Sequence, residues 1–184
     1  MGSDGLKIGV IGAGAWGTAL ARLLASSGNS VQLWCHEPET AKNILQKHVN
    51  TSFLPDILLP ESLGASTDLL EIVRNSRILV AAPPSHLTRE IAKKIRPEIT
   101  AEHILLILSK GIEQHSLALM SEIFAEELDN LPKLAVLSGP TFAREVALDL
   151  PSAAVLACAD ETAGSLLQNC FHSDRFRMYR CTLS

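Results

Sequence analysis

The most informative stretch of this chain is IGVIGAGAWGTALA, residues 8–21. A short apolar run, residues 7–11, is followed at once by Gly12, Gly14 and Gly17 in the spacing GxGxxG. The helix-forming segment TALARLLASS comes next, and a second apolar run begins at residue 30. This order predicts a strand, a glycine turn, a helix and a second strand, which together make a complete βαβ unit.

Each glycine of the motif has a separate expected role. Gly12 would permit the tight turn, Gly14 would let the backbone approach a pyrophosphate, and Gly17 would let helix and strand pack closely. Free N–H groups and the dipole at the helix start favour phosphate groups. We therefore predict a dinucleotide site. The alternative is a glycine-rich turn without a ligand, because GxGxxG also occurs by chance.

The rest of the chain repeats the alternation of strand and helix. Most of the apolar runs do not alternate with polar residues, so we expect strands that are buried on both faces, as in a parallel sheet. The pattern predicts a Rossmann-type, doubly wound α/β fold with a mostly parallel sheet. The predicted strands are 7–11, 30–34, 77–82, 103–108, 134–138, 152–158 and 176–179, and the predicted helices are 16–26, 39–48, 67–75, 85–95, 116–127, 141–148 and 161–170.

Two segments depart from this rhythm. Residues 49–66 contain two prolines and no clear helical period, so we expect a loop that carries a few apolar anchors onto the sheet. Residues 1–6 are polar and short and read as a disordered start or a tag remnant. We expect residues 7–184 to form a single domain that binds a dinucleotide, NAD(P).

Composition excludes several classes of function. The net charge is −4 and no basic run occurs, which argues against nucleic acid or an anionic membrane as a partner. The four cysteines form no CxxC, so neither a disulfide framework nor a metal site is expected. No apolar run reaches the roughly 18 residues of a membrane span. We expect a cytoplasmic protein.

Three polar residues follow predicted strands, where open α/β sheets bind ligands. Lys110 would bind an anionic substrate, polarise a carbonyl group or contact a nicotinamide ribose, although a surface lysine is the alternative. Thr141 is expected to cap the helix that follows Gly139, with free N–H groups facing a substrate oxygen, or to be an ordinary cap. His36 stands where NAD-binding folds place an acid and NADP-binding folds often place a cation. The alternative is that His36 is a solvated loop histidine. The sequence therefore does not decide whether the cofactor is NAD or NADP.

Several longer motifs strengthen this interpretation when they are taken together. They are GAGAWGTALA, LWCHEPE, NTSFLP, PPSH, SKGIE, LSGPTFAREV and PSAAVLA. In this order and spacing they resemble NAD(P)-dependent glycerol-3-phosphate dehydrogenases of the bacterial, soluble type, over residues 7 to about 180. The resemblance implies an oxidoreductase that interconverts dihydroxyacetone phosphate and sn-glycerol 3-phosphate with NAD(P)H and supplies glycerophospholipid synthesis.

The resemblance also implies roles for individual positions. Ala15 stands where similar proteins often have Ser, which leaves only the backbone N–H to meet a phosphate. Lys110 would contact both cofactor and substrate and serve as a catalytic residue. The other implied cofactor contacts are Gly12, Gly14, Trp16, Gly17, His36 and Ala143, and the other implied substrate contacts are Gly139 and Thr141.

The family continues into a helical C-terminal domain that carries a second catalytic lysine. No matching stretch follows Tyr179, so we expect a truncated cofactor domain that is inactive by itself, with a possible homodimer when full-length. Two other hypotheses stay open. One is the N-terminal domain of another two-domain NAD(P)-dependent dehydrogenase, acting on a hydroxy acid, a sugar acid or ketopantoate. The other is a stand-alone nucleotide-binding module without catalysis.

Overall fold

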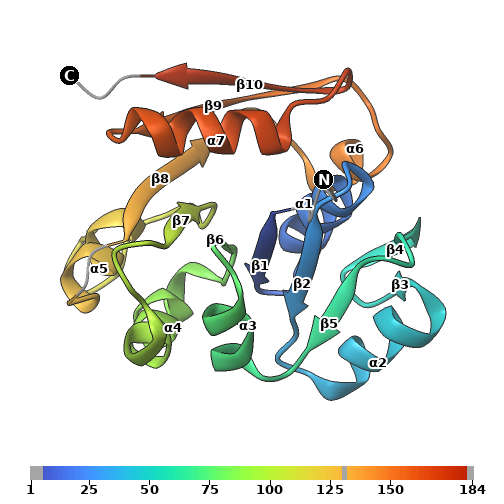
Figure 1. The fold of residues 1–184 in the computed structure, drawn as a ribbon. Helices are drawn as coiled ribbons and strands as arrows, with labels where there is room; N and C mark the ends of the chain where they lie inside the picture. Colours follow the sequence, from blue (N-terminus) through green and yellow to red (C-terminus); the bar gives the residue numbers. More distant parts are fainter. Residues whose placement is uncertain (1–5, 130–131, 182–184) are drawn as a thin grey trace, which may run out of the picture.

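The computed structural model describes residues 6–129 and 132–181 of the chain. An eight-stranded sheet runs through the molecule, and helices cover both of its faces (Figure 1). Most of the predicted disordered start, residues 1–6, lies outside the described residues, but Leu6 packs against the core. In order across the sheet, the strands are β10 (Phe176–Cys181), β9 (Ser152–Cys158), β8 (Lys133–Ser138), β7 (Ile104–Ile107), β6 (Ile78–Ala81), β1 (Lys7–Ile11), β2 (Ser30–Trp34) and β5 (Gly64–Ser66).

The strand order confirms the predicted Rossmann-type fold. From β5 through β2, β1, β6 and β7 to β8, every neighbouring pair is parallel, and the chain reverses direction across the sheet between β1 and β6. This is the doubly wound order in which ligands bind at the reversal point. At the β8 edge of this parallel part of the sheet, β9 pairs antiparallel with β8, and β10 pairs parallel with β9.

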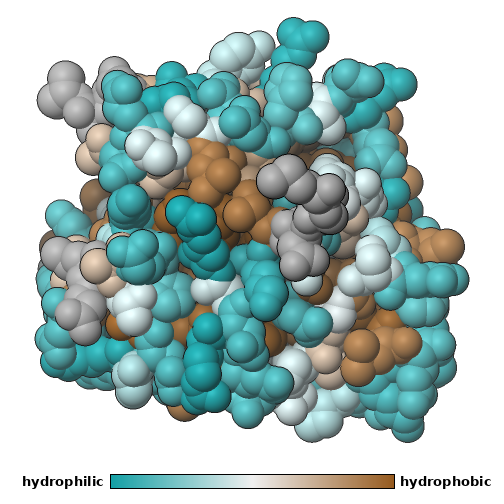
Figure 2. Space-filling model, viewed as in Figure 1, coloured by the Kyte–Doolittle hydropathy of each residue, from teal (hydrophilic) through white to brown (hydrophobic). Residues whose placement is uncertain are grey.

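Two groups of helices cover the two faces. The helices are α1 (Ala15–Ser26), α2 (Pro38–Lys47), α3 (Leu69–Asn75), α4 (Thr88–Ile95), α5 (Met120–Glu127), α6 (Ala143–Ala147) and α7 (Glu161–Phe171), with short 3₁₀ turns η1 (Ser85–Leu87) and η2 (Arg96–Glu98). Residues of α1, α2, α6 and α7 share one buried cluster with one set of strand side chains, and those of α3, α4 and α5 share a second cluster with the opposite set. Polar residues cover most of the face drawn in Figure 2, and a hydrophobic patch remains near its centre, beside α7.

Local sequence explains where several helices begin and end. The carboxylate of Asp68 accepts a hydrogen bond from the Glu71 N–H at 2.9 Å, and Asp160 accepts one from the Ala163 N–H at 2.7 Å. These are N-caps of α3 and α7. Pro38 occupies the first turn of α2, where its missing N–H costs nothing. These contacts place the predicted helices within a few residues of their expected bounds.

The prediction of a loop over residues 49–66 was wrong. Strands β3 (Val49–Asn50) and β4 (Leu54–Leu58) form a small antiparallel sheet, and β5 extends the main sheet beside β2. These strands are short and lie at sheet edges, where Pro55 is tolerated, so their sequence carries little apolar pattern. The expected apolar anchors are present, because Leu54, Ile57, Leu59 and Leu63 are buried in the core.

Two predicted helices begin later than expected. Over 116–127 the helix starts only at Met120, because Leu117 takes a left-handed conformation with φ +59°. Over 141–148 it starts at Ala143, with Phe142 in extended conformation at the N-cap, so the prediction that Thr141 caps this helix was wrong. Residues 85–95 divide into η1 and α4. In the described part of the chain, no helix is both long and apolar enough to cross a membrane.

We expect the stability of the domain to depend on the face of α1 that packs on the sheet. Leu20 is completely buried there, so Leu20→Ala should lower the free energy of unfolding by about 2–5 kcal/mol through lost contacts and a cavity. Leu45 on α2 is 52% exposed, and Leu45→Ala should cost less than about 1 kcal/mol. Urea denaturation of both variants tests this. Equal losses would contradict the assignment of α1 to the core.

Candidate dinucleotide site

A cavity of about 820 Å³ opens at the carboxyl ends of β1, β2, β6 and β7. Its walls come from the glycine turn after β1, the segments after β2, β6 and β7, and the segment between β8 and α6. It therefore lies at the reversal point between β1 and β6, where doubly wound sheets bind ligands. The volume falls within the range of small-molecule and cofactor pockets.

The three glycines of the turn meet three different surroundings. Gly12 has φ +113°, and a Cβ added to it would lie 2.8 Å from the Ala82 carbonyl oxygen. A Cβ on Gly17 would lie only 2.0 Å from the Gly12 carbonyl oxygen, so only glycine allows α1 to approach β1 this closely. Gly14 has nothing within 4 Å of the corresponding point. Gly12 and Gly17 therefore serve the fold, and the space beside Gly14 is open to a ligand.

The glycine turn is held from below by a residue that the sequence did not single out. Asn50 of β3 is 1% exposed, and its Nδ2 donates hydrogen bonds of 2.8 Å to the Ala13 carbonyl oxygen and to Thr18 Oγ1. Thr18 Oγ1 in turn donates to the Ala13 carbonyl oxygen at 3.2 Å. These three hydrogen bonds tie the turn to β3 and to the first residues of α1. Asn50 belongs to the NTSFLP motif, but only the fold brings it under the turn.

One end of the cavity is formed by the segment after β2 and by α4. The rings of Trp34 and His36 meet edge to face at 6.0 Å between centroids. Across from them, Lys94 Nζ pairs with Glu90 Oε1 at 2.6 Å, and both residues line the same cavity. Glu37 lines it too. This end therefore combines acidic and basic groups, which is why the charge of the residue after β2 does not by itself choose between a ribose hydroxyl and a 2′-phosphate.

The other end is formed by the segments after β7 and β8. Lys110 Nζ donates a hydrogen bond of 3.2 Å to the Gly139 carbonyl oxygen, which joins these two segments. Ser109 Oγ donates to the Pro83 carbonyl oxygen at 2.6 Å, which joins the β7 segment to the one after β6. Lys110 is exposed, so its ammonium group is available to an anionic ligand.

The structure brings the predicted residues together in this cavity, except Gly139. A Cβ on Gly139 would lie 3.0 Å from both the Ala153 carbonyl oxygen and Ala154 Cα, so this glycine packs against β9. The predicted residues that line the cavity are Gly12, Gly14, Ala15, Trp16, Gly17, His36, Lys110, Thr141 and Ala143. Other lining residues that the sequence did not single out include Phe53, Leu87, Glu90, Ile91, Lys94 and Phe142.

Cys35 directly follows β2, and its thiol is not a reactive group. It is fully buried, and burial followed by the negative charge of Glu37 raises the pKa of its thiol to about 12. The thiol is therefore protonated at neutral pH and is not a nucleophile. Within the described residues, no cluster of three or more His, Cys, Asp or Glu side chains is arranged to hold a metal ion.

Comparison with known proteins gives one consistent result. Residues 7–164 match the model of the NAD-dependent glycerol-3-phosphate dehydrogenase N-terminus. Glycerol-3-phosphate dehydrogenases [NAD(P)+] from Leptospira biflexa and Citrifermentans bemidjiense are 42% and 44% identical to this chain over 95% of its length. The match covers 53% and 52% of those proteins, so the chain spans about half the length of the curated relatives it matches.

A solved structure supports the same fold. The crystal structure of glycerol-3-phosphate dehydrogenase from Coxiella burnetii superposes with a TM-score of 0.90 at 34% identity. The superposition covers 97% of this chain and 54% of the Coxiella chain. The described architecture is thus that of the N-terminal half of such a protein.

The glycine turn yields a prediction that separates fold from binding. Gly14→Ala adds a methyl group to open space, so the free energy of unfolding should change by less than about 1 kcal/mol, and nucleotide affinity should fall because the methyl group occupies the approach to the turn. Gly17→Ala should lower stability, because its methyl group meets the Gly12 carbonyl. Urea denaturation and NADH titration of both variants test this. An unstable Gly14→Ala, or one that binds NADH normally, would contradict the assignment.

Proposed function

This chain belongs to the NAD-dependent glycerol-3-phosphate dehydrogenase family, and on that premise we propose that it forms the nucleotide-binding half of an enzyme that interconverts dihydroxyacetone phosphate and sn-glycerol 3-phosphate. The observation that carries the proposal is the cavity that joins the glycine turn to Lys110 and to the segment Thr141–Ala143. The nucleotide is NADH or NADPH.

The residues of the cavity fit such a nucleotide from end to end. The N–H groups of Ala15 and Trp16, in the first turn of α1, would meet the pyrophosphate beside the open face of Gly14. His36 lies on the side where this fold places the adenosine ribose. The nicotinamide would then extend toward Lys110 and Ala143. Hydride transfer is the chemistry that the nucleotide supplies when bound.

Lys110 is the residue that connects nucleotide and substrate. Its ammonium group would hold the anionic substrate at the nicotinamide end and stabilise negative charge on the substrate's oxygen. The Gly139 carbonyl oxygen accepts a hydrogen bond from this group and helps to orient it. The family resemblance implies that a second lysine, in the family's helical domain, carries out proton transfer. We therefore assign this chain the roles of binding and orientation.

Two further predictions from the sequence stay predictions. They are a cytoplasmic location and a possible homodimer of the full-length protein.

Calorimetric titration with NADH and NADPH, each with and without glycerol 3-phosphate, tests the proposal. We expect one nucleotide to bind per chain. Lys110→Met should weaken nucleotide binding about tenfold, because it removes an ammonium group beside the negatively charged nucleotide. Lys47→Met, at the exposed end of α2 and outside the cavity, should bind like the unmodified chain.

Absence of binding by both nucleotides would overturn the proposal. Binding that is unaffected by Lys110→Met would overturn the role of Lys110 and leave the nucleotide site in place. The nucleotide that binds more tightly is the cofactor preferred by the end of the cavity where His36 lies with Glu37, Glu90 and Lys94.

A further inference from the structure

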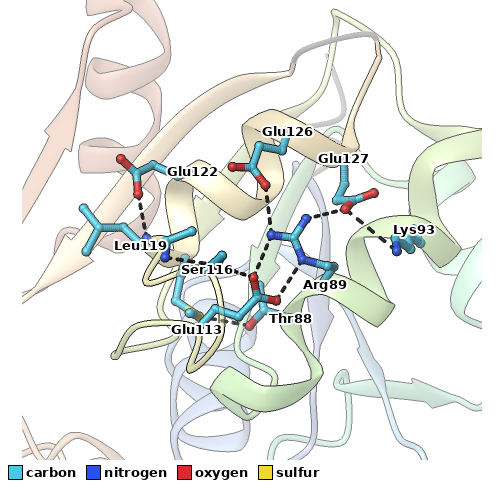
Figure 3. A network of polar contacts seen from close by, with 11 residues as sticks. Thr88, Arg89, Lys93, Glu113, Ser116, Leu119, Glu122, Glu126 and Glu127 are labelled. Atoms are coloured by element: carbon cyan, nitrogen blue, oxygen red, sulfur yellow. Dashed lines mark hydrogen bonds and ion pairs between the residues drawn. The ribbon is translucent and has the colours of Figure 1, made fainter.

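A cluster of charged side chains joins α4 to the loop that carries Lys110 and to α5 (Figure 3). At its centre, Arg89 forms a two-point contact with Glu113: Nε donates to Oε1 at 2.8 Å and Nη2 donates to Oε2 at 2.7 Å. Arg89 Nη2 also donates to Glu126 Oε2 at 2.8 Å, and Nη1 donates to Glu127 Oε1. One guanidinium group thus binds three carboxylates from two different segments.

The contact between Arg89 and Glu113 has the geometry of a strong ion pair. Both side chains are about three-quarters buried, with exposed fractions of 25% and 23%, and parallel two-point contacts of this kind hold orientation as well as distance. Hydrogen bonds from Arg89 and then from Ser116 lower the pKa of Glu113 to about 2. A carboxylate whose pKa is lowered keeps its stabilising contact above its ordinary pKa and loses it only as pH falls toward 2. The contact is therefore intact at neutral pH.

Glu113 is the residue that shapes the loop. Its N–H donates to the Ala118 carbonyl oxygen at 2.9 Å, and its carbonyl oxygen accepts from the Leu117 N–H at 2.9 Å. Its carboxylate also accepts a hydrogen bond from Ser116 Oγ. Glu113 therefore closes residues 113–118 into a compact turn, and Arg89 ties that turn to α4.

Lys110 lies three residues before Glu113, on the cavity side of the same loop. Gly111 stands between them with φ +123°, a conformation that turns the backbone sharply and that other residues rarely adopt. Ser109, on the other side of Lys110, is bonded to Pro83. Lys110 therefore lies between two residues that are held in place: Ser109 by its hydrogen bond to Pro83, and Glu113 by its ion pair with Arg89.

The helices do not need Arg89 to stay together. Ile91 and Ile95 of α4 and Ile123 and Phe124 of α5 are buried in one apolar cluster. This apolar packing holds α4 against α5 without any contribution from the loop residue Glu113. Glu113 lies on the loop before α5, so packing of α4 against α5 does not account for its contact with Arg89.

We propose that Arg89 is a positioning residue for Lys110, and that it acts by clamping Glu113 so that the lysine stays at the nicotinamide end of the cavity. Neither Arg89 nor Glu113 lines the cavity, so neither touches a bound nucleotide. The inference rests on the proposed function, since it concerns the same lysine.

A double-mutant cycle in this chain tests the proposal, with NADH affinity as the measurement. Arg89→Met should weaken NADH binding about tenfold, and Glu113→Gln should do the same, because both release the loop. In a Lys110→Met background, Arg89→Met should change affinity by no more than about twofold, since the residue it positions is gone. A merely structural role predicts the same loss in both backgrounds, and that result would overturn the proposal.

Arg74 provides a matched control. It forms the same kind of two-point contact with Glu98, at 3.1 and 2.7 Å, but joins α3 to η2 instead of the Lys110 loop. Arg74→Met should leave NADH affinity unchanged. A loss equal to that of Arg89→Met would show that any lost ion pair weakens the site, and would overturn a specific role for Arg89.

Hydrogen exchange without nucleotide keeps the two proposals apart. Amides of residues 109–119 should exchange faster in Arg89→Met and in Glu113→Gln, and at the original rate in Arg74→Met. If the unmodified chain does not bind NADH, the proposed function fails, while the exchange rates still decide whether Arg89 holds the loop. Unchanged exchange in Arg89→Met would overturn the proposal whatever the nucleotide does.

Discussion

Helix α1 lies so close to the end of β1 that one methyl group on Gly17 would reach within 2.0 Å of the Gly12 carbonyl oxygen. This close approach fixes where the helix begins, and therefore where its free N–H groups and the positive end of its dipole lie. The buried amide of Asn50 also holds the turn, through hydrogen bonds to the Ala13 carbonyl oxygen and to Thr18 Oγ1. The floor of the cavity is set by these contacts, because the Gly12–Gly17 segment forms it.

The remaining walls of the cavity are attached to the same helix. α6 packs against α1, and Arg22 of α1 holds Asp149, just after α6, through two hydrogen bonds of 3.0 and 2.9 Å. Arg144 of α6 also donates to the Pro55 carbonyl oxygen of β4 at 3.2 Å. The segment that contains Thr141 is therefore braced against α1, by a contact between Arg22 and Asp149, which are 127 residues apart in sequence. This bracing gives the cavity a preformed shape.

The sequence predicted the elements whose signals are local. Continuous apolar runs such as ILVA in β6 mark strands that are buried on both faces, and three strands were predicted with their observed bounds. It did not predict β5, because a three-residue edge strand reading GAS has almost no apolar pattern. The antiparallel direction of β9 was equally hidden, since the pattern of apolar residues along a strand does not show in which direction the strand pairs.

In the site, too, the sequence predicted the residues that have a local signal and not those placed by tertiary packing. Residues of the glycine turn are recognisable because spacing and chain position combine there, whereas Asn50, Glu90 and Lys94 enter only through tertiary packing. The Thr141 cap was predicted from residue type alone, and the extended Phe142 displaced it. Arg89 carried no signal at all, because its three carboxylate partners lie 24 to 38 residues further along the chain.

The chain offers a direct test of its cavity, because its two tryptophans, Trp16 and Trp34, both line it. NADH absorbs where tryptophan emits, so a nucleotide in this cavity should quench the intrinsic fluorescence. The account predicts saturable quenching by NADH that excess NAD+ or NADP+ reverses. Fluorescence that stays unchanged, while NADH binding is detected by calorimetry, would place the nucleotide elsewhere and contradict the account.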